Sequence, residues 1–404
     1  MTTDCDVLIA GAGPAGAALA LALSPLALRV CLADAAPDPA ADTPDRRALA
    51  LALGSQRILA GLDAWPALAP LAAPITAITV TQRGWPGVTR LDARTVREPA
   101  LGYVVGDRAL QRALLARLAG SAVRRLPAAV GAITPADEQL EVTLATADGS
   151  PQRLTTRLLV AADGSGSAVC GLAGLTTQQR ELADSVLLAH LHTDRPHHGV
   201  AHERFADGRA LALLPAPGTC DYTLVWTLPH ERAADLAALP PSIVAPMLQD
   251  VLGWRAGRVR RLDQMRCVPL REQWLTQATG TRLLAIGNAA NTLHPIAAQG
   301  FNSGLRDVAT VAELLAGASR ADDDPGADTL LAAYQRRREA DWQRLRLATG
   351  WLPRLFENPA PPQAAARSLG LTALDLCGPL KRHLMRRAMG LHGPQSPLQR
   401  GRRP

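Results

Sequence analysis

Three glycines near the start of the chain have the spacing of a phosphate-binding turn, Gly11-x-Gly13-x-x-Gly16. An apolar run, Val7–Ala10, precedes them and predicts a buried strand, and Ala17–Leu23 after them consists of good helix formers. In such a unit Gly11 permits the sharp turn, Gly13 lets the backbone approach a pyrophosphate, and Gly16 lets the helix pack on the strand. Free N–H groups at the helix start attract phosphate oxygens. The unit therefore predicts a dinucleotide site.

A second strand is predicted over Arg29–Asp34, and it ends in an acid 18 residues after Gly16. A carboxylate at this position accepts hydrogen bonds from ribose hydroxyls. A lone glycine pattern is a weak signal, but a strand, turn, helix, strand and terminal acid in this order form a strong one. The pattern does not distinguish FAD from NAD.

Two later segments each run from a predicted buried strand into a polar loop. The strand Leu158–Ala162 leads into Asp163-Gly164. The strand Leu283–Ile286 leads into a longer loop, and a helix is predicted after it over Val308–Leu315. The polar, proline and glycine positions of this longer loop are Gly287, Asn288, His294, Pro295, Gln299, Gly300 and Asn302.

With these three motifs the sequence resembles the FAD-dependent aromatic hydroxylases (group A flavoprotein monooxygenases), from about residue 4 to Gly390. The late loop is most similar to that of the ubiquinone-biosynthesis hydroxylases of polyprenylated methoxyphenols. The resemblance implies an α/β fold with an FAD-binding, doubly wound domain of the glutathione-reductase type, an inserted β-rich substrate domain and a C-terminal helical region. The implied boundaries are 1–74, 100–178 and 273–345 for the FAD-binding domain, 75–99 and 179–272 for the substrate domain, and 346–404 for a basic helical tail.

The alternating apolar pattern of three segments fits the substrate domain. Ile75–Val80, Ala210–Pro215 and Tyr222–Thr227 are predicted strands of a second sheet. Because pieces of the FAD-binding domain lie before and after these strands, the substrate domain is expected to be inserted rather than appended.

The resemblance also assigns roles to single residues. The glycine turn and Asp34 would hold the ADP half of FAD, and two arginines would lie along the flavin. Asp163 would help both FAD and the nicotinamide donor, Asn288 would bond the ribityl chain, and the late loop would line the isoalloxazine ring, with His294 near its face. The implied cofactor-binding residues are Gly11, Gly13, Gly16, Asp34, Arg47, Arg108, Asp163, Gly164, Gly287, Asn288, Pro295, Gln299, Gly300 and Asn302.

The chain departs from the family pattern at three positions. Asn288 stands where most members have Asp, and an amide can still accept a hydrogen bond from a ribityl hydroxyl. Cys170 stands where the Asp-Gly motif usually closes with Arg, which puts the nicotinamide contact in doubt. Ala298 replaces a frequent glycine.

The implied reaction is hydroxylation of the ring of a polyprenylated methoxyphenol, with FAD as cofactor, NAD(P)H as reductant and O₂ as co-substrate. No side chain is predicted to act as an acid or base catalyst, because the cofactor performs the difficult step and the protein positions the ring and excludes water. Two alternatives stay open. One is a hydroxylase of the same family that acts at another ring position or on a soluble phenol. The other is a flavoprotein partner of a lipid-biosynthesis complex without turnover of its own, which the Cys170 departure favours.

Composition excludes several other functions. Lys381 is the only lysine, so neither a Walker A motif nor a kinase active site is present. The six cysteines include no C-x-x-C pair, and a histidine group around His190–His202 is expected to be a solvated strand-and-loop region rather than a metal site. Aromatic residues make up only 3%, which speaks against nucleic-acid binding.

Positive charge is concentrated in the tail. Residues 333–404 contain fourteen Arg or Lys and four Asp or Glu, a net +10, so the remaining chain carries about −3 of the total of +7. Trp351–Phe356 and Leu380–Met389 combine apolar and basic residues, as expected for a segment that binds a membrane surface or a partner of a ubiquinone-biosynthesis complex. The other interpretation is an ordinary capping helix with solvated arginines. We expect a cytoplasmic protein, with peripheral attachment to the inner face of the membrane if the first interpretation holds.

Overall fold

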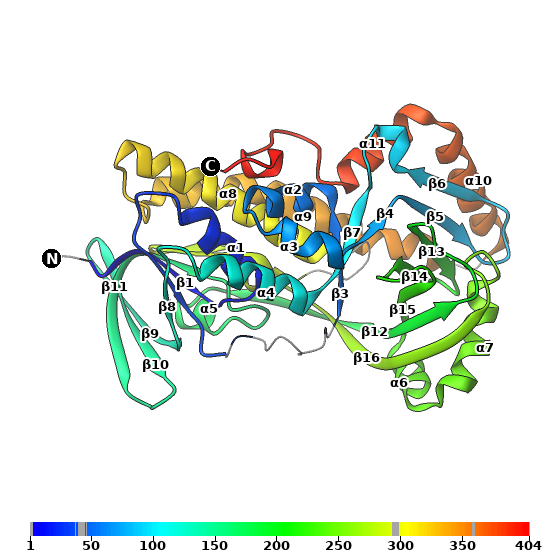
Figure 1. Cartoon of the computed structure of the whole chain (residues 1–404), viewed down its shortest axis with the longest axis horizontal. Helices are drawn as coiled ribbons and strands as arrows, with labels where there is room; N and C mark the ends of the chain where they lie inside the picture. Colours follow the sequence, from blue (N-terminus) through cyan, green and yellow to red (C-terminus); the bar gives the residue numbers. More distant parts are fainter. Residues whose placement is uncertain are drawn as a thin grey trace.

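A first sheet of mostly parallel strands carries the N-terminal motif. The computed structural model describes residues 3–36, 38, 45, 47–292, 299–357 and 360–403, so His294, Pro295 and Ala298 lie outside the described residues. Every residue of β1 (Cys5–Ala10) is buried, because helices cover one face and neighbouring segments the other. The order is β17 (Thr279–Gly280), β18 (Leu283–Ala285), β11 (Pro151–Ala161), β1, β2 (Val30–Ala33) and β8 (Arg124–Leu126), with a hairpin of β9 (Ala128–Ala136) and β10 (Gln139–Thr146) beside β11 (Figure 1).

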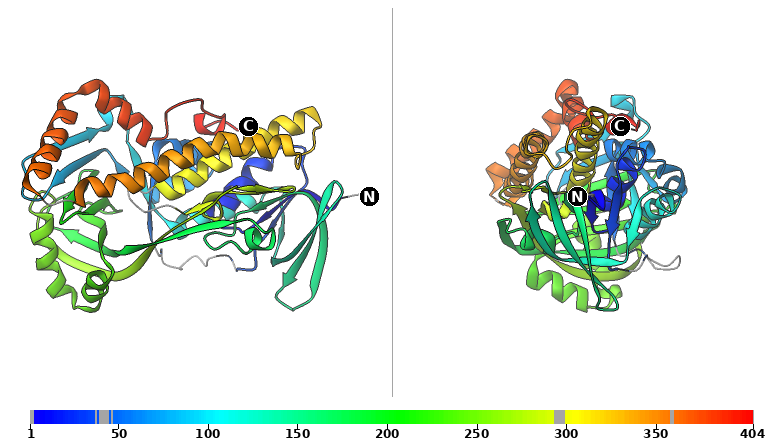
Figure 2. Two further views of the ribbon diagram at one scale, coloured as in Figure 1. Left: turned by 180° about the vertical axis from the view of Figure 1, so that it is seen from behind. Right: turned by 90° about the vertical axis from the view of Figure 1, so that its left-hand side faces the viewer.

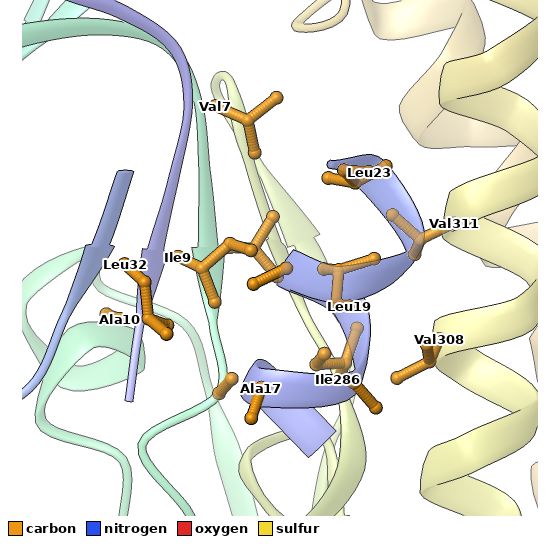
Figure 3. Close-up of a cluster of buried hydrophobic side chains, with 14 of the residues drawn as sticks. Val7, Ile9, Ala10, Ala17, Leu19, Leu23, Leu32, Ile286, Val308 and Val311 are labelled. Carbon is orange, nitrogen blue, oxygen red and sulfur yellow. The ribbon is translucent and has the colours of Figure 1, made fainter. Parts of the chain in front are cut away.

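Two helices cover this sheet and form its core. The helix α1 (Pro14–Leu23) lies between β1 and α8 (Gln299–Ala321), and Figure 3 shows Ile9, Leu19 and Val308 in one cluster. The other helices of this part are α2 (Leu53–Gly61), α3 (Trp65–Leu68), α4 (Asp107–Leu118), α5 (Ala168–Leu172) and α9 (Asp328–Glu357), with short 3₁₀ turns η1 (Ala69–Leu71), η3 (Gly287–Ala289) and η5 (Leu398–Arg400).

A second sheet lies beside the first and takes its strands from several separate parts of the sequence. Two of its strands, β12 and β16, are 17 residues long and run from the region of the first sheet into the second (Figure 1). The order is β19 (Asn291–Thr292), β16 (Val259–Leu275), β12 (Thr177–Thr193), β15 (Asp221–Pro229), β14 (Arg209–Pro215), β13 (Val200–Ala206), β5 (Ala77–Gln82) and β6 (Val88–Asp92).

One face of the second sheet is closed by helices. Apolar side chains of β12, β14 and β15 pack there against α6 (His230–Ala238) and α7 (Pro241–Leu252). A small sheet of β3 (Ala48–Ala52), β7 (Gly102–Gly106) and β4 (Ala73–Ile75), with η2 (Ala93–Val96), connects the two large sheets. The predicted strand Ile75–Val80 is in fact two strands, β4 and β5, because the chain changes sheet at Thr76.

The C-terminal residues pack into the body of the protein. The long helix α9 passes beside α8 toward the second sheet, and α10 (Pro361–Leu376) and α11 (Gly378–Ala388) follow it at that end (Figure 2). Met385 and Met389 are buried at 1% and 2% exposure, and the Met389 carbonyl accepts the Gly54 N–H at 2.8 Å. In the part of the chain that the structure describes, no helix is long and apolar enough to span a bilayer.

Candidate FAD and substrate site

The glycine turn has the backbone that its sequence predicts. Gly11 has a φ of +104°, which favours glycine, and a Cβ there would lie 2.6 Å from the Ala162 carbonyl oxygen. A Cβ on Gly16 would lie 1.9 Å from the Gly11 carbonyl oxygen, so helix α1 approaches the turn as closely as glycine allows. A Cβ on Gly13, in contrast, would meet no heavy atom within 4 Å. The backbone at Gly13 is therefore open to a ligand, directly before the N-terminus of α1.

Asp34 stands at the end of β2 beside this turn. One carboxylate oxygen accepts the N–H of Ala12, and the other accepts the N–H of Ala36 at 2.7 Å. These bonds fix the carboxylate next to the turn and leave further lone pairs for a ribose hydroxyl, because a carboxylate can accept about four hydrogen bonds.

Helix α4 also contacts the glycine turn. Gln111 donates from Nε2 to the Ala12 carbonyl at 3.2 Å and accepts at Oε1 from Arg108 Nη1 at 3.1 Å. The Nε atom of Arg108 is buried and has no hydrogen-bond partner among the described residues. A buried N–H without an acceptor is costly, and a bound anion or carbonyl would supply one. Arg47 lies near this helix, with 3.6 Å between its Nε and Asp107 Oδ2, and remains largely exposed.

The Asp-Gly motif forms a capped turn that touches the late loop. Asp163 accepts from Ser167 Oγ at 2.5 Å and from the Val169 N–H at 3.2 Å, which fixes the start of α5. Gly164 has a φ of +89°. The hydroxyls of Ser165 and Thr292 lie 2.9 Å apart, so residues far apart in sequence meet at this edge.

Cys170 lies inside α5 and does not replace an arginine functionally. Its thiol is 2% exposed, and burial raises its pKa to about 11, so the group stays neutral. A neutral buried thiol offers no charge to a nicotinamide phosphate.

The late loop starts in a turn that a buried acid supports. Gly287 has a φ of +60° and donates its N–H to Asp307 Oδ2 at 2.9 Å. Asn288 follows and is partly accessible, and its side chain has no hydrogen-bond partner among the described residues. Asn291 is 3% exposed, and neither its side-chain oxygen nor its nitrogen has a partner in the described structure.

Three predicted late-loop residues lie at the start of α8. Gln299 and Gly300 form its first turn and are partly accessible. Asn302 is instead 1% exposed, and its side chain is bound to the small sheet and α2. It accepts from the Ala52 N–H at 2.8 Å and from Ser55 Oγ at 2.7 Å, and donates to the Ala50 carbonyl at 2.9 Å. The side chain of Asn302 therefore positions the N-terminus of α8.

Two residues of the histidine group, His192 and His197, have polar partners within the protein. His192 Nδ1 lies 2.8 Å from Asp221 Oδ1, and His197 Nε2 lies 2.6 Å from the Gly218 carbonyl oxygen. The described residues contain no group of three or more His, Cys, Asp or Glu side chains that could hold a metal ion.

These contacts bring the three predicted motifs to one end of the first sheet. The open backbone at Gly13, the unpaired N–H of Arg108 and the acid at Asp34 fit a dinucleotide with its pyrophosphate over α1. Residues 4–348 match the family described as the FAD binding domain. The chain belongs to this family of flavin-dependent aromatic hydroxylases. FAD is its cofactor, and NAD(P)H is the usual co-substrate of the family.

Similarity to characterised proteins extends over the whole chain. It is 37% identical over 407 residues to the ubiquinone hydroxylase UbiL of Rhodospirillum rubrum, covering 98% of this chain and 92% of that protein. It is 28% identical to the 3-demethoxyubiquinol 3-hydroxylase of Escherichia coli, covering 96% and 98% of the two chains. The crystal structure of p-nitrophenol 4-monooxygenase from Pseudomonas putida superposes with a TM-score of 0.79 at 17% identity, covering 98% of this chain and 100% of that one. The last comparison shows a shared fold.

Sequence reasoning missed three residues of this region. Gln111, Asn291 and Glu203, which is described below, are not among the residues that the family resemblance assigns. Asn291 lies within the late motif, where a polar residue at the end of a buried strand was a usable signal. Gln111 and Glu203 become visible only through contacts between distant elements.

Proposed function

We propose that this enzyme hydroxylates the aromatic ring of a polyprenylated methoxyphenol in ubiquinone biosynthesis, with NAD(P)H as reductant and O₂ as the source of the new oxygen. The observation that carries the proposal is the end-to-end similarity to UbiL at 37% identity. A 3-demethoxyubiquinol hydroxylase with nearly complete coverage of both chains supports the same class of substrate.

The residues of the first sheet would hold the cofactor. The N–H groups before α1 would receive the pyrophosphate, Asp34 the ribose, and Arg108 Nε a further oxygen of the cofactor. Asn288 is free to bond the ribityl chain. When bound, FAD accepts hydride from NAD(P)H and delivers one oxygen atom of O₂ to an electron-rich ring. The protein's own part is to bind, to orient the ring and to keep water away.

The face of the second sheet that is directed away from α6 and α7 would hold the substrate. Here Val80, Ala212, Val225 and Leu188 are neighbours across β5, β13, β14, β15 and β12, and each is partly accessible. The opposite face of the same strands is buried under α6 and α7. A row of partly accessible apolar side chains fits a prenyl chain, because burial of each CH₂ contributes about 0.8 kcal/mol.

The outer surface of α10 and α11 would bring the enzyme to the membrane that contains such a substrate. Leu369 and Leu376 of α10 are 71% and 81% exposed, and Leu380 and Leu384 of α11 are 49% and 41% exposed. The exposed arginines beside them are Arg382, Arg386 and Arg387. Exposed leucines flanked by cations fit the interface of an anionic membrane.

Product analysis under labelled oxygen gas tests the reaction. The purified FAD-loaded protein is incubated with NAD(P)H and a prenylated methoxyphenol, and one labelled atom is expected on the ring and the other in water. If NAD(P)H is consumed only to hydrogen peroxide, or not consumed at all, the protein is not a hydroxylase of this phenol. If a short soluble phenol is hydroxylated faster than the prenylated one, the assignment to ubiquinone biosynthesis is wrong and the soluble-phenol alternative holds.

A further inference from the structure

Glu203 is a charged residue in the middle of the apolar substrate face. It lies in β13, paired with Val80 of β5 on one side and Ala212 of β14 on the other. Side chains alternate between the two faces of a strand, so Glu203 shares its face with Ala201 and Phe205. The row continues across Ala212 to Val225 and Leu188, and none of these neighbours carries a charge.

The neighbours of Glu203 show which way this face points. Ala201 packs with Ala73 of β4 and Val104 of β7, and Phe205 packs with Leu355 of α9. Leu214, on the same face, packs in the cluster that also contains Ala50 of β3. The carbonyl of Ala50 accepts the hydrogen bond from Asn302, at the start of α8. The face that holds Glu203 is therefore directed toward the late loop and away from α6 and α7.

No donor among the described residues lies within hydrogen-bond distance of the Glu203 carboxylate. The side chain is set among protein atoms that desolvate it, and part of the residue's surface is accessible. Burial without a compensating partner raises the pKa of Glu203 to about 7. An unpaired carboxylate in an apolar wall costs free energy, and such a group is a common sign of a functional site.

We propose that Glu203 binds the phenolic hydroxyl of the substrate and accepts its proton. This inference rests on the proposed function, because it names the residue that would meet the ring in that site. The geometry supports it: a single hydrogen-bond acceptor stands in a row of apolar side chains that would hold the rest of the molecule. A phenol presents a single O–H donor, and the carboxylate of Glu203 is an acceptor for it.

The proton transfer makes the ring more reactive. As the phenolic O–H bond breaks, its proton moves to a carboxylate oxygen of Glu203, and the bonding electron pair stays on the phenol oxygen. The resulting phenolate donates electron density to the ring. A ring carbon then forms a bond to one oxygen atom derived from O₂, the bond between the two oxygen atoms breaks, and the second oxygen leaves as water, with the two electrons supplied by NAD(P)H. The attacked carbon afterwards loses its hydrogen as a proton to solvent, and Glu203 returns its proton to the phenol oxygen. No further oxidant or reductant is needed beyond those of the hydroxylation.

Few other charges face this position. Among the described side chains, the titratable or charged groups on this face of the surrounding elements include Tyr103 of β7, His190 of β12 and Arg266 of β16, which is paired with Leu188. Arg367 of α10 donates from its guanidinium to the Leu355 carbonyl at 2.9 Å. On β13 itself, His202 and Arg204 lie on the opposite face, and Arg204 donates to the Val251 carbonyl at 2.6 Å. A pH dependence near neutrality that disappears when Glu203 is replaced can therefore be assigned to Glu203.

The first experiment compares wild type, E203Q, E203D and E181Q, the last changing an exposed glutamate of β12 that is 83% accessible. Each protein is tested for bound FAD, for reduction by NAD(P)H and for labelled-oxygen product across the pH range. We expect E203Q to keep FAD and its reduction, to lose product formation by on the order of 100-fold, and to lose the rise in wild-type activity around neutral pH. E203D is expected to recover part of the rate, and E181Q to match wild type. Equal rates and equal pH profiles in E203Q and wild type would overturn the inference.

A binding experiment separates this inference from the reaction. The affinity of wild type and E203L is measured for a prenylated phenol and for its O-methyl ether, by the change in protein fluorescence. Wild type is expected to prefer the phenol by on the order of 10- to 100-fold, because a hydrogen bond to a charged group is stronger than one between neutral groups, and E203L to bind both equally. If wild type prefers the phenol but no hydroxylated product forms, the proposed function is wrong, while the hydrogen bond between Glu203 and the phenolic hydroxyl is supported. If wild type binds phenol and ether equally, the role of Glu203 is rejected even when product forms.

Discussion

The carboxylate of Asp307 in α8 and the guanidinium of Arg338 in α9 form a buried ion pair, with 2.6 Å between Oδ1 and Nε. The two side chains are 1% and 5% exposed. Trp342 donates from Nε1 to the same oxygen at 3.2 Å, and the second oxygen accepts the N–H of Gly287. One buried acid thus connects two long helices to the turn that begins the late loop. The ion pair holds the backbone next to the predicted ribityl site.

Removal of Arg338 is expected to leave the buried Asp307 carboxyl group without its ion-pair partner. R338M should lower the free energy of unfolding by about 3–5 kcal/mol, because an uncompensated buried charge is costly. It should also weaken FAD binding, since Asp307, which accepts the Gly287 N–H, is no longer held in place by Arg338. The control is R337M, which removes a half-exposed partner of Glu313 and should cost less than about 1 kcal/mol. Denaturant unfolding and FAD titration measure both effects, and equal losses in the two variants would contradict the prediction.

The second and third glycines of the turn, Gly13 and Gly16, separate ligand binding from folding. G13V places a side chain where the structure has open space, so the protein should fold and fail to bind FAD. G16V places it against the Gly11 carbonyl, 1.9 Å from the new Cβ, so the fold itself should lose several kcal/mol, on the order of an overpacked core site. Thermal unfolding without added FAD distinguishes them. A G13V protein that is yellow when purified would show that the pyrophosphate does not lie there.

The sequence predicted the parts of the site that depend on local backbone. The strand, turn and helix around Gly11 and Gly16 follow from residue type and spacing alone, and the structure places them at β1 and α1. The turn at Asp163 and the predicted helix Val308–Leu315 are local in the same way, although this helix is part of α8, which already includes Gln299. Such features need no knowledge of distant segments, because the atoms that form them are near in sequence.

Features that depend on long-range contacts could not be predicted in this way. The place of Asn302 near the flavin stays a prediction, and what the sequence did not reveal is that its buried side chain bonds Ala50 and Ala52, which are about 250 residues earlier. The face that Glu203 occupies is set by pairing of β13 with β5, more than 100 residues apart. From the sequence alone, without the pairing of β13 and β5, an isolated glutamate near Phe205 is expected to be an ordinary solvated residue. The helices of the tail were expected, but the burial of Met385 and Met389 was not, because their contacts come from other parts of the chain.

Glu203 is expected to make stability depend on pH. Its pKa is raised to about 7 from a reference value of 4.5, so between these values the folded state holds a proton that the unfolded state has lost. The free energy of unfolding therefore falls as pH rises through this window. E203Q cannot ionise at this position. Between about pH 5 and pH 8 its free energy of unfolding should therefore fall by about 1–3 kcal/mol less than that of wild type. Denaturant unfolding at both pH values measures this, with E181Q as the exposed control, and parallel curves for E203Q and wild type would exclude it.

The exposed leucines of α10 and α11 are expected to bind anionic membranes. Deletion of the tail is a poor test, because it would remove the buried Met385 and Met389. The double variant L376E/L380E leaves these contacts intact and should reduce partitioning to vesicles that contain phosphatidylglycerol by at least about tenfold, since burial of a leucine contributes about 1.5–3 kcal/mol. Vesicle sedimentation measures it. L71E, at a leucine 50% exposed on η1, serves as the control. Equal binding by all forms would favour the capping-helix interpretation.

The apolar row beside Glu203 is expected to make affinity depend on prenyl length. Each buried CH₂ is worth about 0.8 kcal/mol, or about a fourfold gain in affinity, so every added isoprene unit should tighten binding by on the order of tenfold or more until the face is covered. L188N introduces a polar amide at a partly accessible position of this row, and should weaken binding of long-chain phenols while binding of short-chain phenols stays unchanged. Fluorescence titration with phenols of increasing prenyl length measures both trends. If affinity is independent of chain length in wild type, the prenyl chain does not lie on this sheet, whichever ring is hydroxylated. If affinity rises with length equally in L188N and wild type, the chain binds elsewhere on the protein.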